Sequence, residues 1–143
     1  MSNGKEDMAH SRIIDCTWNN DTKVASVTRS SQWGVFTCFA KPNEEDMENV
    51  SKWIGWQVAD YKCMMLIAKK KAEAMRQRYI AISNATNELN QKGNYSLNNF
   101  SKIYKQNWVE ARADYLLLKR NLKKYCEDML KERNNFLLVH SKN

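Results

Sequence analysis

The chain has 143 residues and a formal net charge of +7, and its 43% hydrophobic content is that of one globular domain with a core of its own. Only four glycines and one proline occur, which excludes a glycine-rich phosphate loop, a dinucleotide fingerprint and a turn-dense β-sandwich. The two histidines, His10 and His140, lie near the chain ends, so histidine-based catalysis and metal sites are not expected. We therefore expect a protein that is not an enzyme and has neither a cofactor nor a metal.

The cysteine spacing and the first ten residues bear on the cellular compartment. The cysteines lie too far apart for a zinc motif and are too sparse for a disulfide framework. Residues 1–10 are polar and no run of eighteen apolar residues occurs, so neither a signal peptide nor a membrane span is predicted. We expect a cytoplasmic protein whose thiols are reduced and mostly buried. The four cysteines are Cys16, Cys38, Cys63 and Cys126.

The positive charge is confined to the second part of the chain. Residues 1–46 carry five Lys and Arg against seven Asp and Glu, whereas residues 47–143 carry eighteen against nine. The two parts therefore sum to −2 and +9. The hydrophobic period changes at the same place, from a strand-like to a helical pattern.

Residues 11–41 predict a three-stranded antiparallel β-meander. Asn, Asp and Ser at 19–21 and at 30–32 are typical of turns between the strands. Gly34 lies inside the third strand and indicates either a bulge, which we favour, or a close approach of another backbone or a ligand. The expected strands are 12–18, 23–29 and 33–40.

A helical period of apolar residues extends over two long segments, 43–91 and 96–139. Asn43 is a candidate N-cap of the first helix, while Gly93 and Ser96 are typical of a helix end and a new N-cap. We expect a single α+β domain in which a small N-terminal sheet precedes a long antiparallel helical hairpin.

So small a sheet covers only one end of such a hairpin. Apolar residues also fall outside the main helical register, at Trp53 and Trp56 in the first helix and at Leu116 and Leu117 in the second. Helices that carry apolar residues on more than one face usually bury the remainder against another subunit. We therefore predict a homodimer or a higher homo-oligomer assembled through the helices.

Two basic runs on the helices are candidates for phosphate contacts, because few glutamates stand four residues away to neutralise them. The alternative is an ordinary solvated helix face. The runs comprise Lys69, Lys70, Lys71, Arg76 and Arg78 in the first helix, and Lys119, Arg120, Lys123 and Lys124 in the second.

Two groups of aromatic and charged residues are further candidates for ligand contacts. Trp18 and Trp33 each border a turn, with Arg29 between them in the sequence. An aromatic platform beside an arginine can stack a base and pair a phosphate, although tryptophans are more often part of a core.

Arg112 and Asp114 lie in the middle of the second helix, outside its core register. They are either ordinary solvated residues or a charged pair at a subunit interface that holds a polar ligand.

The stretch 27–41, VTRSSQWGVFTCFAK, resembles the Thoeris anti-defence proteins of phages, as do the acidic helix start and the paired long helices. The resemblance implies an oligomer that sequesters the cyclic ADP-ribose-type signal of the bacterial Thoeris immune system without cleaving it. Some members of that family also hold cyclic oligonucleotides. The resemblance further implies a small anionic nucleotide as partner and the cytoplasm of an infected bacterium as location.

The same resemblance implies which residues contact the ligand. In an antiparallel hairpin Arg112 lies near Arg78 and far from its own sheet, so a site that combines Arg112 with Arg29 requires two subunits. The residues to which the resemblance assigns ligand contacts are Arg29 and Arg112, and with less support Trp18, Ser31, Asn94 and Asp114.

Two other classes of function are compatible with the same pattern. A β-meander followed by a helix with net positive charge is also loosely typical of double-stranded RNA binders. The sheet region is acidic, however, and no RNP-like aromatic motif occurs, so nucleic acid is the less favoured partner. A protein-binding inhibitor that uses its long helices as the contact surface is the third possibility.

Overall fold

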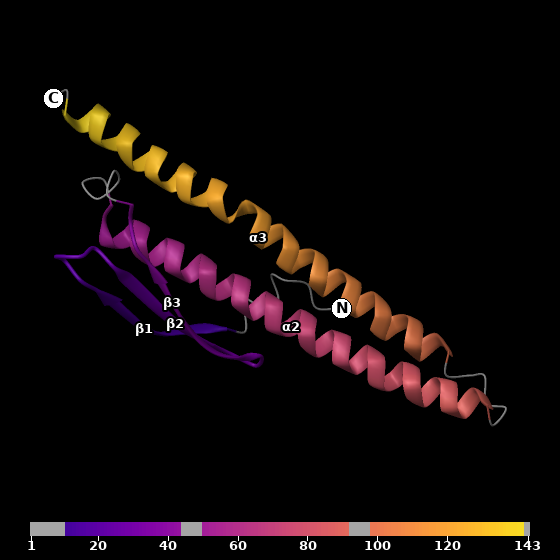
Figure 1. Ribbon diagram of the computed structural model, residues 1–143. Helices are drawn as coiled ribbons and strands as arrows, with labels where there is room; N and C mark the ends of the chain where they lie inside the picture. Colours follow the sequence, from indigo (N-terminus) through magenta and orange to yellow (C-terminus); the bar gives the residue numbers. More distant parts are fainter. Residues whose placement is uncertain (1–10, 44–49, 92–97, 142–143) are drawn as a thin grey trace.

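The computed structural model describes residues 11–43, 50–91 and 98–141, which form three layers (Figure 1). A three-stranded sheet lies on one side of helix α2 (Lys52–Gln91), and helix α3 (Asn98–Ser141) lies on the other side. The sheet covers mainly the half of α2 that begins the helix, and most of the remaining half packs against α3. The expected α+β class, with an N-terminal antiparallel sheet and two packed long helices, is confirmed.

The strands β1 (Arg12–Trp18), β2 (Ala25–Ser31) and β3 (Gly34–Ala40) form an antiparallel meander in the order β1-β2-β3. The second strand begins two residues later than expected because the preceding turn is longer. The Asn19 side chain accepts hydrogen bonds from the backbone N–H groups of Asp21 and Thr22. Lys23 then takes a left-handed conformation with φ of 57°, which belongs to the turn.

The predicted bulge at Gly34 is wrong, and what approaches Gly34 is the Phe36 side chain rather than another backbone or a ligand. Gly34 pairs regularly with Ser31 at the start of β3. Its φ is 134°, and an added Cβ would lie 3.2 Å from the Phe36 ring. The irregularity of the sheet lies instead in β1, where the register shifts between Ile13 and Asp15.

Small residues of α2 allow the sheet to approach the helix closely. Gly55, Ala59 and Cys63 recur every four residues, and Ala59 and Cys63 are fully buried. A Cβ added to Gly55 would lie only 2.7 Å from the Cβ of Ala25 and 3.1 Å from the Trp18 ring. Any side chain at this position would therefore push the sheet away from the helix.

The first long helix begins at Lys52 and not at residue 43. The Ser51 hydroxyl accepts a hydrogen bond from the Ile54 backbone N–H, so Ser51 is the N-cap of α2. Asn43 is neither helical nor part of a strand, and the acidic residues 44–46 lie outside the described residues. The second helix begins at Asn98, close to the expected residue 96.

Aromatic pairs join α2 and α3 and fix their antiparallel register. The rings of Tyr61 and Tyr125 stack with centroids 4.5 Å apart, and those of Tyr79 and Trp108 stack at 5.7 Å. The Tyr61 hydroxyl also donates a hydrogen bond to the Leu118 carbonyl, at 2.7 Å. Since residue numbers rise along α2 while they fall along α3, the two helices form an antiparallel hairpin.

Helix α3 packs against α2 on one face and leaves apolar side chains on its other faces. Val109, Leu116 and Leu117 are each close to half exposed, as is expected of residues outside the core register. At the start of α2, Trp53 is 64% exposed. The prediction of an oligomer rests on these exposed apolar side chains.

Candidate functional site

Arg29 joins the sheet to α2 through a two-point ion pair with Asp60. Its Nε and one terminal nitrogen donate hydrogen bonds to the two Asp60 carboxylate oxygens, at 2.8 and 3.0 Å. Its other terminal nitrogen donates to the Ser11 hydroxyl, at 2.8 Å, and to the Ser11 carbonyl. This parallel geometry is the strong form of an arginine–carboxylate pair.

This arrangement gives Arg29 a structural partner where the resemblance implies a ligand. Only 13% of its side chain is exposed, and 23% of that of Asp60. The cation therefore already has a carboxylate counter-charge within its own chain. A phosphate could contact Arg29 only in competition with Asp60.

Two other residues that the resemblance implies have local structural roles. The Trp18 ring packs over Gly55, where the sheet meets α2, and its indole N–H points to the Asn20 side chain at 3.5 Å. The Ser31 hydroxyl closes the β2–β3 turn by donating to the Gly34 carbonyl and accepting from the Trp33 backbone N–H. Asn94 lies outside the described residues.

Arg112 and Asp114 lie on α3, where Arg112 is exposed and Asp114 is half-buried. Their neighbour Ala111 packs in a cluster with Ala72 of α2. Asp60, the partner of Arg29, lies twelve residues before Ala72, which is about 18 Å along the helix. The chain therefore does not bring Arg29 and Arg112 together by itself.

The arginine that accompanies an aromatic platform is Arg78 and not Arg29. The Arg78 guanidinium lies over the Trp33 ring, with its central carbon 5.5 Å from the ring centroid. Trp33 is in the β2–β3 turn, so this contact joins the end of the sheet to the middle of α2. The sequence indicates both residues as candidates, but it gives no sign that they meet, because 45 positions separate them.

We call this pair, together with the cluster of Ala72, Met75, Trp108 and Ala111 on which Trp33 packs, the Trp33 corner. Trp33 and Trp108 pack against a buried cluster that includes Met75 and Ala111, so the end of the sheet reaches the middle of α3. We expected Arg112 to lie far from its own sheet, but its neighbour Ala111 belongs to the cluster against which Trp33 of the β2–β3 turn packs. The indole N–H of Trp33 is buried and has no acceptor among the described residues.

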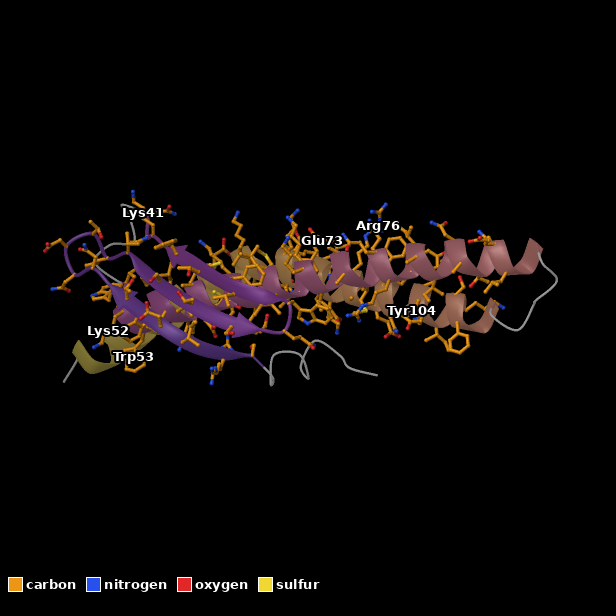
Figure 2. The ribbon with its side chains drawn as sticks, turned by 90° about the horizontal axis from the view of Figure 1, so that it is seen from below. Lys41, Lys52, Trp53, Glu73, Arg76 and Tyr104 are labelled. Atoms are coloured by element: carbon orange, nitrogen blue, oxygen red, sulfur yellow. The ribbon has the colours of Figure 1, made fainter. Side chains whose placement is uncertain are left out.

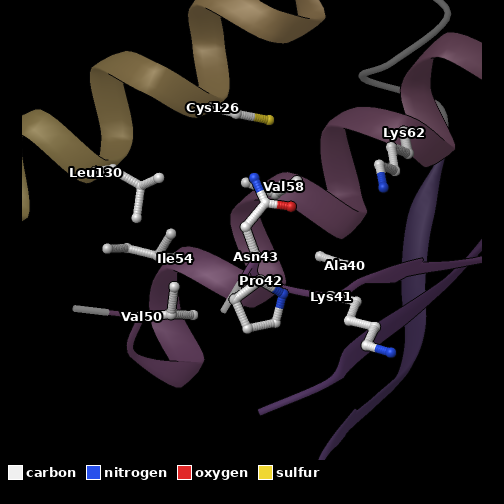
Figure 3. A pocket seen from close by; sticks show the side chains of 11 residues that line it. Ala40, Lys41, Pro42, Asn43, Val50, Ile54, Val58, Lys62, Cys126 and Leu130 are labelled. Carbon is white, nitrogen blue, oxygen red and sulfur yellow. The ribbon is translucent and has the colours of Figure 1, made fainter. Parts of the chain in front are cut away.

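A separate cavity of about 190 Å³ lies where β3 leads to α2, beneath the C-terminal half of α3 (Figure 3). Ile54, Val58 and Leu130 form its apolar part, while Lys41 and Lys62 supply positive charge. Pockets for drug-sized ligands and cofactors usually enclose about 300–1,000 Å³, so this cavity is too small for a whole nucleotide.

The thiols of α2 and α3 remain protonated at neutral pH. Burial first, and then the neighbouring Cys38, raises the pKa of the Cys63 thiol to about 12. Burial also raises the pKa of Cys126, although the nearby Lys62 opposes this shift. Since the thiolate is the nucleophilic form of cysteine, neither side chain has the character of an activated nucleophile.

The residues that the structure describes offer neither a metal site nor a membrane span. Within them, His, Cys, Asp and Glu form no group of three or more side chains that could hold a metal ion. Nor does any helix there contain a stretch that is both long enough and apolar enough to cross a bilayer. No protein-family model, curated protein or solved structure matches this chain.

Replacing Asp60 by Asn should destabilise the protein by about 2–4 kcal/mol, because it leaves the largely buried Arg29 cation without its counter-charge. Urea unfolding measures this change. The matched control is Glu73→Gln, which breaks an exposed pair with Lys70 and should cost less than about 0.5 kcal/mol. Equal losses in the two variants would contradict a structural role for the Arg29–Asp60 pair.

Proposed function

We propose that this protein binds and sequesters a cyclic ADP-ribose-type signalling nucleotide without degrading it, as a phage anti-defence protein of the Thoeris type. It would act as a homo-oligomer in the cytoplasm of the infected cell and would need no metal or cofactor. Cyclic oligonucleotides are possible further ligands of the same kind. The resemblance of residues 27–41 suggests this function, and one contact in the fold supports it.

That contact is the position of the Arg78 guanidinium over the Trp33 ring, with its central carbon 5.5 Å from the ring centroid. A guanidinium held over an indole loses side-chain freedom before any ligand binds, so less entropy is lost when it contacts a phosphate. Arg78 is itself exposed, so the edge of its guanidinium is accessible to solvent. An arginine oriented in this way is a group that recognises a phosphate.

The middle of α3 contributes the second half of the proposed site. Arg112 is exposed, and Asp114 follows the buried Ala111 by three residues, about one helical turn. A shallow hollow on α3 is lined by Asp114 together with Leu116, Leu117 and Arg120. A second subunit packed on this apolar surface would enclose the charged residues beside it, and an enclosed site strengthens electrostatic contacts to an anion.

Arg78→Ala should weaken nucleotide binding by roughly tenfold or more, because a charge-assisted contact to phosphate contributes about 1.5–3 kcal/mol. Calorimetric titration with cyclic ADP-ribose isomers measures the affinity. Arg76→Ala is the matched control, since it removes an equally exposed arginine two positions away that does not lie over Trp33. Equal effects of the two variants, or no binding of any isomer by the parent protein, would contradict the proposal.

Leu116→Arg should reduce the oligomer to a monomer, because it places a charge in the apolar surface of α3. Sedimentation velocity at micromolar concentration measures the change. Phe39→Arg introduces the same charge at a similarly exposed residue of β3 and should leave the oligomer intact. A parent protein that sediments as a monomer would refute assembly through the helices.

A further inference from the structure

One side of the helix pair carries two rows of basic residues at seven-residue intervals. Residues seven apart lie on nearly the same face of an α-helix, with a drift of about 20° per interval. Each row therefore runs along its helix at steps of about 10 Å. We call the two rows together the cationic strip: Lys62, Lys69 and Arg76 on α2, and Lys105, Arg112 and Lys119 on α3.

Contacts between the helices place both rows on the same side. Tyr79 stacks on Trp108, and Arg76 precedes Tyr79 by three residues. Lys105 and Arg112 lie three residues before and four residues after Trp108, so they are its neighbours on the surface of α3. At the other end of the strip, Lys62 lines the same cavity as Cys126 of α3, which follows Lys119 by seven residues.

The charges of the strip reach the solvent and meet little opposing charge. Its residues are exposed except for Lys62, which is half-buried and donates a hydrogen bond to the Phe39 carbonyl at 3.0 Å. Glu73 projects from α2 close to Arg76 (Figure 2), but its carboxylate pairs with Lys70, at 3.3 Å. Lys41 lies along the same edge of the molecule and extends the positive charge beyond Lys62.

The dimensions of the strip match a nucleic-acid backbone. The two stacked aromatic pairs set the register of the helices. In this register the basic residues of α2 and those of α3 alternate along the strip over a length of about 30 Å. This distance corresponds to about nine base pairs of a duplex. We propose that the cationic strip binds the phosphate backbone of double-stranded nucleic acid without reading its sequence, an activity beyond the sequestration of a small nucleotide.

A duplex fits this surface better than a single strand does. Proteins that bind single strands usually present exposed aromatic rings on which bases stack. On the strip, the Trp108 ring is half-buried and already stacked on Tyr79. The strip is also straight, because two packed α-helices carry it, and a duplex axis is straight over this length, so successive backbone crossings can meet basic residues along the strip. Such contacts bring affinity and strong salt dependence without base recognition.

Two double variants with the same loss of charge test this assignment. Lys69→Gln with Lys105→Gln removes two charges from the strip, whereas Lys124→Gln with Lys131→Gln removes two exposed charges of α3 outside it. Fluorescence anisotropy with a labelled 24-base-pair duplex, of DNA or of RNA, measures affinity over a range of salt concentrations. The strip variant should bind roughly tenfold more weakly than the parent protein. Its slope of log K against log[salt] should be less negative by about 2, while the control should keep the parent slope.

The same measurement can overturn the proposal in three ways. Equal losses in the two double variants would mean that diffuse charge, and not the strip, attracts the duplex. Absence of binding by the parent protein at 50 mM salt would exclude the activity. Tighter binding to vesicles that contain phosphatidylglycerol than to the duplex would assign the surface to a membrane. Arg112 belongs to both the strip and the proposed nucleotide site, but none of the four substituted lysines is part of that site, so a failure here leaves the proposed function untouched.

Discussion

The architecture depends on α2, which buries two opposite faces at once. Toward the sheet it presents the small residues Gly55, Ala59 and Cys63, which allow the strands to approach the helix closely. Toward α3 it presents larger side chains such as Tyr61 and Tyr79, which stack on aromatic residues of that helix. Among the described elements α3 packs mainly against α2, so its other faces keep both apolar and basic residues at the surface.

The hydrophobic periods of the sequence predict the meander, the two long helices and their antiparallel packing, since these features follow from local patterns. Contacts between distant positions leave no such signal. Nothing near Arg29 indicates that Asp60, 31 residues later, neutralises it, and nothing near Trp33 indicates Arg78. The start of α2 was misplaced because Asn43 and Ser51 are both good N-caps, and only the fold shows that Ser51 caps the helix.

The charge distribution has a different meaning in the two parts of the molecule. The sheet's Arg29 is used internally, where it ties β2 to α2. Many basic residues of the helices are exposed instead, in the Trp33 corner and along the cationic strip. The two proposals assign these exposed charges to ligands of one chemistry, phosphate, at two different scales, a small nucleotide and a duplex.

The proposed function requires that the protein holds its nucleotide without altering it. The most direct measurement is to saturate the protein with a cyclic ADP-ribose isomer, remove the unbound ligand, denature the protein by heat and identify the released compound by mass spectrometry. Sequestration predicts release of the intact cyclic isomer in an amount equal to that bound, with no decrease over hours. A linear, hydrolysed product that accumulates with time would contradict sequestration and would make the protein an enzyme.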